Sequence, residues 1–136
     1  MSASVLGFIE HTRRVGAPMP PALVASLLNA AARSAEKEQR PLRPDLVLVD
    51  ELGRLTLAPP DFAEGPPPPG YVPPEVRAGQ HAADDARALV YGAGAFGWHL
   101  LQGVSPSEER DLSQLTGPLG DIVRVALAQE RRERFG

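Results

Sequence analysis

The sequence predicts a single domain, residues 1–136, that is mainly α-helical with one small β-hairpin and a long proline-rich loop. Apolar residues recur at helical spacing over most of the chain. Two short β-rich runs flank a glycine turn, and half of the residues from Pro59 to Pro74 are proline. At 136 residues the chain is long enough to bury a hydrophobic core as one unit.

Two helices are predicted before the hairpin. The first is amphipathic, with apolar spacing i, i+3, i+4, i+7 from Val5, Phe8, Ile9 and Thr12. Ser2 or Ser4 can cap its start, and Gly16 can end it. The second begins at the pair Pro20-Pro21, which a first turn tolerates, and continues through Ala35 into the charged stretch "EKEQR".

The periodicity changes after the second helix. Leu46 to Val49 and Arg54 to Leu57 are short β-rich runs joined by "DELG", where Gly53 suits a left-handed turn position, so they predict a β-hairpin. Residues 58–74 then form a proline-rich loop, because proline removes backbone donors and disfavours both helix and sheet. We expect this loop to be extended and on the surface, as a semi-rigid spacer rather than a ligand for polyproline-reading domains.

Ala83 to Gln102 is predicted to be a buried central helix. It is mostly apolar, and close packing would explain the glycines Gly92, Gly94 and Gly97, which otherwise weaken a helix. We expect His99 on this helix to be hydrogen-bonded and partly buried. The stretch "SPSEERDLSQL" predicts a capped helical turn or a short helix, with Ser105 or Ser107 as the candidate cap. A last helix carries an apolar stripe of Leu119, Ile122, Val123, Ala126 and Leu127.

Composition excludes several classes of function. A net charge of −3 and a pI near 5.6 leave no general basic field for nucleic acid. Without cysteine there is no disulfide, thiolate metal site or cysteine nucleophile. His11, His81 and His99 are too far apart to predict a metal site, and we expect no cofactor. No signal peptide or membrane span is predicted, so we expect a cytoplasmic protein with neither membrane nor nucleic acid as a partner.

Several stretches occur in a fixed order along the chain: "MPPALVASLLNAAARSAEKEQR", "LRPDLVLVDELGRLTL", "YVPPEV", "VYGAGAFGWHLLQG" and "DIVRVALAQERRERF". Leu42-Arg43-Pro44 is similar to the Leu-Lys-Pro of a protein-kinase catalytic loop, and Pro74-Glu75 to the Pro-Glu that ends an activation segment. In this order and spacing, nearly the whole chain resembles the C-terminal lobe of a bacterial serine/threonine protein kinase. The resemblance implies a kinase C-lobe-like helical bundle, with residues 58–74 in place of the activation segment.

The departures from the family pattern concern catalysis. Gln39-Arg40-Pro41 replaces His-Arg-Asp, so the aspartate that accepts the substrate proton is missing. Leu46 replaces the metal-binding asparagine, and only a two-residue shift would place Asp61 as the Asp of Asp-Phe-Gly. The chain also has no residues for the N-terminal lobe (N-lobe) that holds the nucleotide. The resemblance therefore implies a catalytically inactive pseudokinase.

The resemblance also implies a structural ion pair. Glu75 and Arg134 correspond to a buried pair that ties the activation segment to the C-terminal helices in the family. Burying a carboxylate is costly unless it is paired, which favours retention of this contact. The alternative is that Glu75 is a surface charge beside the proline loop.

The leading hypothesis for function is a scaffold or regulatory module that docks on another protein, such as a signalling kinase, or on a second copy of itself. Without an N-lobe, the face that it would cover is open, and an open apolar patch marks an interface. The candidate interface residues are Leu46, Leu48, Leu55 and Leu57, although strand alternation lets only some of them face outward. Two alternatives are a split kinase completed by a partner N-lobe, and a dinucleotide-binding protein that uses Gly92–Gly97, a G-x-G-x-x-G string.

Overall fold

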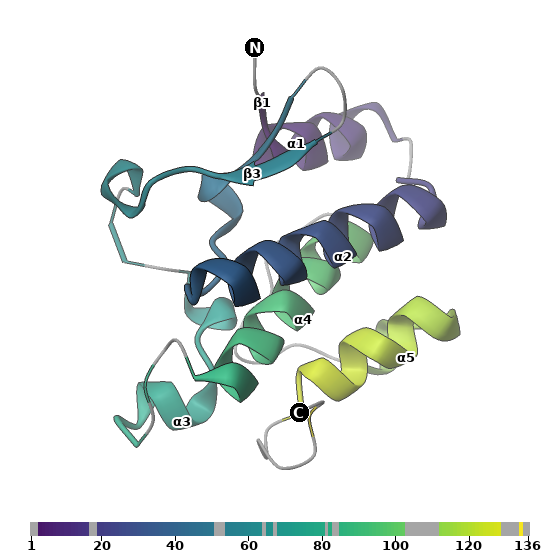
Figure 1. Ribbon diagram of the computed structural model, residues 1–136. Coiled ribbons are helices and arrows are strands. Elements are labelled where there is room, and N and C mark those ends of the chain that lie inside the picture. The colour runs from purple at the N-terminus through teal and green to yellow at the C-terminus, as the bar shows by residue number, and fades with distance from the viewer. Residues whose placement is uncertain are drawn as a thin grey trace.

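The protein is mainly helical, as its sequence predicts (Figure 1). A computed structural model describes residues 3–16, 19–50, 54–63, 65–66, 68–80, 82, 85–102, 112–128 and 134. The helices are α1 (Val5–Val15), α2 (Pro21–Glu38), α3 (Pro74–Arg77), α4 (Ala86–Gln102) and α5 (Gly117–Ala126). The strands are β1 (Ala3–Ser4), β2 (Val47–Val49) and β3 (Leu55–Leu57). Short 3-10 turns cover Pro44–Leu46, Pro60–Phe62, Pro69–Tyr71 and Leu112–Gln114. None of the described helices is long and apolar enough to cross a membrane.

The predicted hairpin is present and gains a third, two-residue strand. The sheet order is β1-β2-β3, with both pairings antiparallel. Ser4 pairs with Leu48 in this sheet and directly precedes the first residue of α1, so its capping role stays a prediction. Gly16 does follow that helix with a left-handed φ of 72°, as a helix-ending glycine should. The predicted turn residue Gly53, like Ser105 and Ser107, lies outside the described residues.

The centre of the fold is α4, which lies between α2 and α5 in Figure 1. Its middle is buried on all sides, with Tyr91 and Phe96 at 0% exposure. A Cβ at Gly94 would lie 2.8 Å from Ala126 Cβ, and one at Gly97 would lie 2.7 Å from Val123 Cγ2. Real Cβ atoms do not approach so closely, so these two glycines let α4 and α5 pack backbone against side chain. Gly92 differs, because its nearest neighbour would be 3.7 Å away.

The proline-rich loop is less extended and less exposed than predicted. Two 3-10 turns interrupt it, and Tyr71 near its end is 3% exposed. Gly70 and Pro73 are buried beside that tyrosine in the sequence. The first part of the loop does lie on the surface, where Phe62 is 70% exposed. An aromatic side chain placed after the prolines therefore draws the end of the loop into the core.

We expect Gly94→Ala to lower the free energy of unfolding by about 1–3 kcal/mol, since the new methyl group meets the backbone of Ala126 as well as its side chain. Urea unfolding followed by circular dichroism measures the change. Gly92→Ala is the matched control on the same helix. It should leave stability unchanged or raise it, because its Cβ has ordinary contacts and alanine is the better helix former. Equal losses in both variants would contradict close packing at Gly94.

Candidate functional site

The candidate site is the segment Gln39–Leu46, which joins the end of α2 to the start of β2. Gln39 ends the helix with a left-handed backbone, φ 53° and ψ 46°, and its amide Nε2 donates to the Glu36 carbonyl at 2.6 Å. A residue other than glycine adopts this conformation only when its surroundings hold it there. At this position, which corresponds to the histidine of the family pattern, the side chain thus caps the end of the helix.

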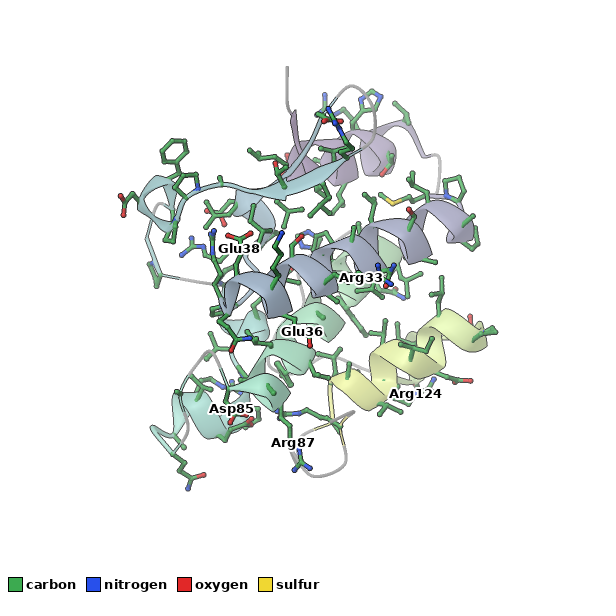
Figure 2. All side chains as sticks on the ribbon, in the orientation of Figure 1. Arg33, Glu36, Glu38, Asp85, Arg87 and Arg124 are labelled. Carbon is green, nitrogen blue, oxygen red and sulfur yellow. The ribbon has the colours of Figure 1, made fainter. Side chains whose placement is uncertain are left out.

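Arg40 connects the segment to the far end of the hairpin. Its Nη2 donates to the Ala58 carbonyl at 2.6 Å, and its Nη1 pairs with the Glu38 carboxylate at 3.2 Å. Figure 2 shows Glu38 on the side of α2 that faces the end of β3. The guanidinium is thereby committed to the fold, and its charge is met by an adjacent carboxylate.

Arg43 is held in the same manner. Its Nε and Nη2 donate to the two oxygens of Asp45 at 3.0 and 3.1 Å, a bidentate arrangement. Its Nη1 donates to the Gly65 carbonyl at 3.0 Å, which fastens the proline-rich loop to the segment. Asp45, two residues along the chain, therefore neutralises the charge of Arg43, and the same side chain fixes the proline-rich loop to the segment.

Leu46 is buried at 4% exposure, so its prediction as an interface residue is wrong. Its backbone carbonyl accepts from Ala58 N at 2.8 Å, which places it beneath the base of the hairpin. Leu55 and Leu57 pack partly against the core, opposite Val49 and Val47, and are likewise unsuited to an open patch.

Leu48 is the remaining interface candidate. It pairs with exposed Thr56 and alternates with fully buried Val47, which places it on the outer face of the sheet, half-buried. The predicted surface is thus reduced from four leucines to one, because three of them serve the core.

Pro41 and Asp61, the other residues compared with kinase catalytic and metal-binding positions, lie apart from any cluster of potential metal ligands among the described residues. Pro41 is exposed, and Asp61 is exposed within the 3-10 turn Pro60–Phe62. Among the described residues no group of three or more His, Cys, Asp or Glu side chains could hold a metal ion. The segment and the loop therefore present no assembled carboxylates within the part of the chain that the structure covers.

The dinucleotide alternative is contradicted by the placement of Gly92–Gly97. These residues lie in the middle of α4, and the "ALVY" that precedes them is helical rather than a strand. The fingerprint needs a glycine turn at a helix N-terminus after a parallel strand, where free N–H groups meet the pyrophosphate. Here those N–H groups are inside a helix, and the glycines serve packing.

Glu75 and Arg134 meet in a buried, bidentate ion pair. Nη1 donates to Oε2 at 2.6 Å and Nη2 to Oε1 at 2.9 Å, with the arginine side chain fully buried. The remaining donors reach the Ala128 carbonyl at 2.8 Å and the Arg87 carbonyl at 3.3 Å. The guanidinium also lies 4.7 Å from the Tyr91 ring centre. This single side chain therefore joins α3, α4 and the end of α5.

Tyr71 and His99 form a second buried polar contact, and Tyr71 was not anticipated from the sequence. The tyrosine hydroxyl lies 3.0 Å from His99 Nδ1 and donates to it when Nε2 carries the ring proton. Burial lowers the pKa of His99, opposed by Glu10, and raises the pKa of Tyr71 well above 10, helped by Asp45. Both groups are thus kept neutral. A tyrosine at the end of a proline run is a sequence signal for burial. Its partner His99 could not be identified in this way, because it lies 28 residues further along the chain.

We expect Arg134→Met to cost about 3–5 kcal/mol of folding stability, because it leaves the Glu75 carboxylate buried without a partner. Chemical denaturation measures the loss. The double variant Glu75→Gln with Arg134→Met should recover part of it, since no unpaired charge remains. An exposed arginine offers the control: Arg54→Met, whose Nε lies 2.9 Å from Asp50 Oδ2, should change stability by no more than about 1 kcal/mol. A loss no larger at Arg134 than at Arg54 would contradict the structural role.

We expect stability to fall as the pH drops below about 6.5. The folded pKa of His99 lies below this ordinary value, so the unfolded chain binds a proton that the folded chain refuses. Above pH 10 stability should fall again, since Tyr71 ionises more readily when unfolded. The midpoint of urea unfolding, measured across this pH range, tests both losses of stability. His99→Gln should reduce the loss at acid pH, whereas His11→Gln, at an exposed side chain, should leave it unchanged.

No protein-family model matches the chain, and no curated protein resembles it in sequence. The chain does resemble solved structures in its fold. The PknI kinase domain of Mycobacterium tuberculosis matches with a TM-score of 0.70 and 24% identity, over 99% of this chain and 58% of that one. A double-mutant form of that domain gives 0.69 and 22%, over 99% and 57%. This chain therefore spans less than two thirds of those kinase domains, and its fold is that of part of a bacterial kinase domain.

Proposed function

We propose that the chain is a non-catalytic, kinase-like interaction module that docks on another protein in a scaffold or regulatory role. The observation that carries this proposal is the set of structural contacts made by the segment Gln39–Leu46. Arg40 and Arg43 bind backbone carbonyls, and Leu46 is buried. The fold resembles part of a kinase domain, while the position that would hold the catalytic carboxylate is Pro41. The position that would hold a metal-binding amide is Leu46, at 4% exposure.

Phosphoryl transfer depends on metal ions, a positioned nucleophile and cations directed at the phosphates. Leu46 has no oxygen for Mg²⁺. Arg43 stands where the family places a lysine, but Asp45 and the Gly65 carbonyl occupy its donors. These features support the loss of chemistry together with the retention of the scaffold.

A split kinase, completed by a separate N-lobe, is less well supported. Such a partner could supply a nucleotide site, but it could not replace Pro41 or Leu46, which belong to this chain. The half-buried Leu48 and exposed Thr56 form the outer face of the hairpin, where an N-lobe would sit. This face is only weakly apolar, which favours a different docking surface on the molecule.

We expect the purified protein to show no Mg²⁺-dependent rise in melting temperature with millimolar ATP, and no phosphate transfer to itself or to a generic substrate. A ligand that binds only the folded state must raise the melting temperature, so the assay is direct. An active bacterial kinase domain serves as the positive control.

An ATP-dependent shift that Asp61→Asn abolishes would show that the exposed carboxylate replaces the missing metal ligands. That result would overturn the non-catalytic assignment. A shift with NAD would contradict the packing role of Gly92–Gly97 and reopen nucleotide binding.

A further inference from the structure

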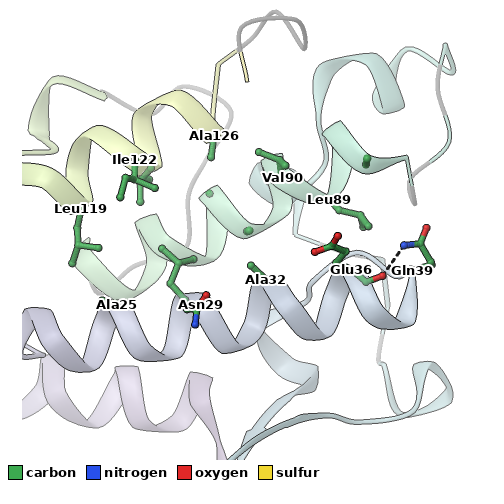
Figure 3. Close-up of a pocket in the computed structure, with 15 residues that line it drawn as sticks. Ala25, Asn29, Ala32, Glu36, Gln39, Leu89, Val90, Leu119, Ile122 and Ala126 are labelled. Atoms are coloured by element: carbon green, nitrogen blue, oxygen red, sulfur yellow. Dashed lines mark hydrogen bonds between the residues drawn. The ribbon is translucent and has the colours of Figure 1, made fainter. Parts of the chain in front are cut away.

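A groove of about 680 Å³ runs between α2 and α5, with α4 as its floor (Figure 3). It lies on the side of α2 that faces α4 and α5, away from the hairpin. Gln39 is the one residue of the candidate site among its described lining residues, so the groove meets that site only at the end of α2. No sequence motif marked it, because its walls come from three helices far apart in the chain.

The groove is apolar and accessible to a partner. Only Asn29, Glu36 and Gln39 among its lining residues are polar. Ile122 on its α5 wall is 47% exposed, and Leu28 and Leu119 are half-buried. Ile122 and Leu119 are three residues apart on one face of α5, so the exposed apolar surface is continuous. Soluble proteins leave such surface uncovered mainly where something binds.

The shape of the groove fits a helix. Its α2 wall extends from Ala25 to Gln39, a length of about 21 Å at 1.5 Å per residue, which matches about four helical turns. Small residues line its base, among them Ala32, Ala93 and Gly94. Small side chains allow the ridge of an approaching helix to seat deeply between α2 and α5.

One end of the groove is negatively charged. In Figure 3 the Glu36 carboxylate points into the groove, near Leu89. No ion pair joins Glu36 to another described residue, while Glu38 points to the opposite side of α2 and pairs with Arg40 (Figure 2). The C-terminal end of α2 adds partial negative charge at the same place. A cationic group is therefore favoured at this end of the groove.

We propose that this groove is the docking site of the module, and that it binds an amphipathic helix of another protein. That helix would present apolar side chains at i, i+3, i+4 and i+7 to the groove and one lysine or arginine to Glu36. The proposal rests on the proposed function and adds the surface and the chemistry of the partner. A helix satisfies its own backbone hydrogen bonds, so it can lie on apolar walls that offer few polar groups.

The test uses the full chain and two fluorescein-labelled, helix-forming peptides of about 14 residues, the length of the groove wall. Both carry leucines at the spacing above, and one has lysine in its first and last turns where the other has glutamate. Fluorescence anisotropy measures affinity, and amide chemical shifts locate the peptide. We expect the lysine peptide to bind at the groove and Ile122→Asp to weaken it by about tenfold. Val15→Asp, an exposed apolar position outside the groove, is the matched control and should bind normally.

Charge reversal tests the role of Glu36 without disturbing the core. Glu36→Lys should weaken the lysine peptide by about threefold to fivefold and strengthen the glutamate peptide by a similar factor, as for an exposed ion pair. No peptide binding, or equal losses with Ile122→Asp and Val15→Asp, would overturn the proposal. So would self-association that Ile122→Asp abolishes, which would assign the groove to a second copy, or binding of a small apolar dye without either peptide.

Failure of this proposal is distinguishable from failure of the proposed function. If ATP with Mg²⁺ leaves the melting temperature unchanged and neither peptide binds, only the groove assignment is wrong. If ATP with Mg²⁺ stabilises the protein and supports phosphate transfer, the non-catalytic role is wrong whatever the peptides do.

Discussion

The rest of the structure depends on the close approach of α4 and α5, which Gly94 and Gly97 make possible. Side chains at these positions would occupy the space now filled by Ala126 and Val123. Because α4 also packs against α2, its position sets the distance between the two outer helices. Arg134 donates to Glu75 of α3, to the Arg87 carbonyl of α4 and to the Ala128 carbonyl just after α5. A buried cation is tolerated only when it is paired, so this contact requires the helices to be held accurately.

In the segment Gln39–Leu46, a sequence similar to a kinase catalytic loop makes structural contacts. Arg40 and Arg43 each reach a backbone carbonyl beyond the hairpin, at Ala58 and Gly65, and so hold the loop to the end of α2. Leu46 supports the base of the hairpin from within the core. These contacts stabilise the local fold without a ligand. They also commit cations and apolar groups that would otherwise be available to a ligand.

The distribution of apolar surface shifts attention from the hairpin to the opposite side of α2. Three of the four leucines expected at an interface are in or against the core, whereas Ile122 on α5 remains open to solvent beside an apolar groove. The proposed non-catalytic role requires a surface that selects a partner. Apolar walls supply affinity for such a partner, and the lone carboxylate at one end supplies orientation.

The sequence by itself determined the elements. Helical periodicity located α1, α2, α4 and α5, and turn chemistry located Gly16 at the end of α1, because these signals depend on neighbours within about one turn. The pairing of Glu75 with Arg134 was also predicted, but only through the resemblance to a kinase lobe. Tertiary structure alone decided which leucines are buried, that Ser4 joins a sheet, that Tyr71 meets His99, and that a groove exists between α2 and α5. Each of these depends on residues distant in sequence, and a local pattern carries no information about which distant surface will cover a side chain.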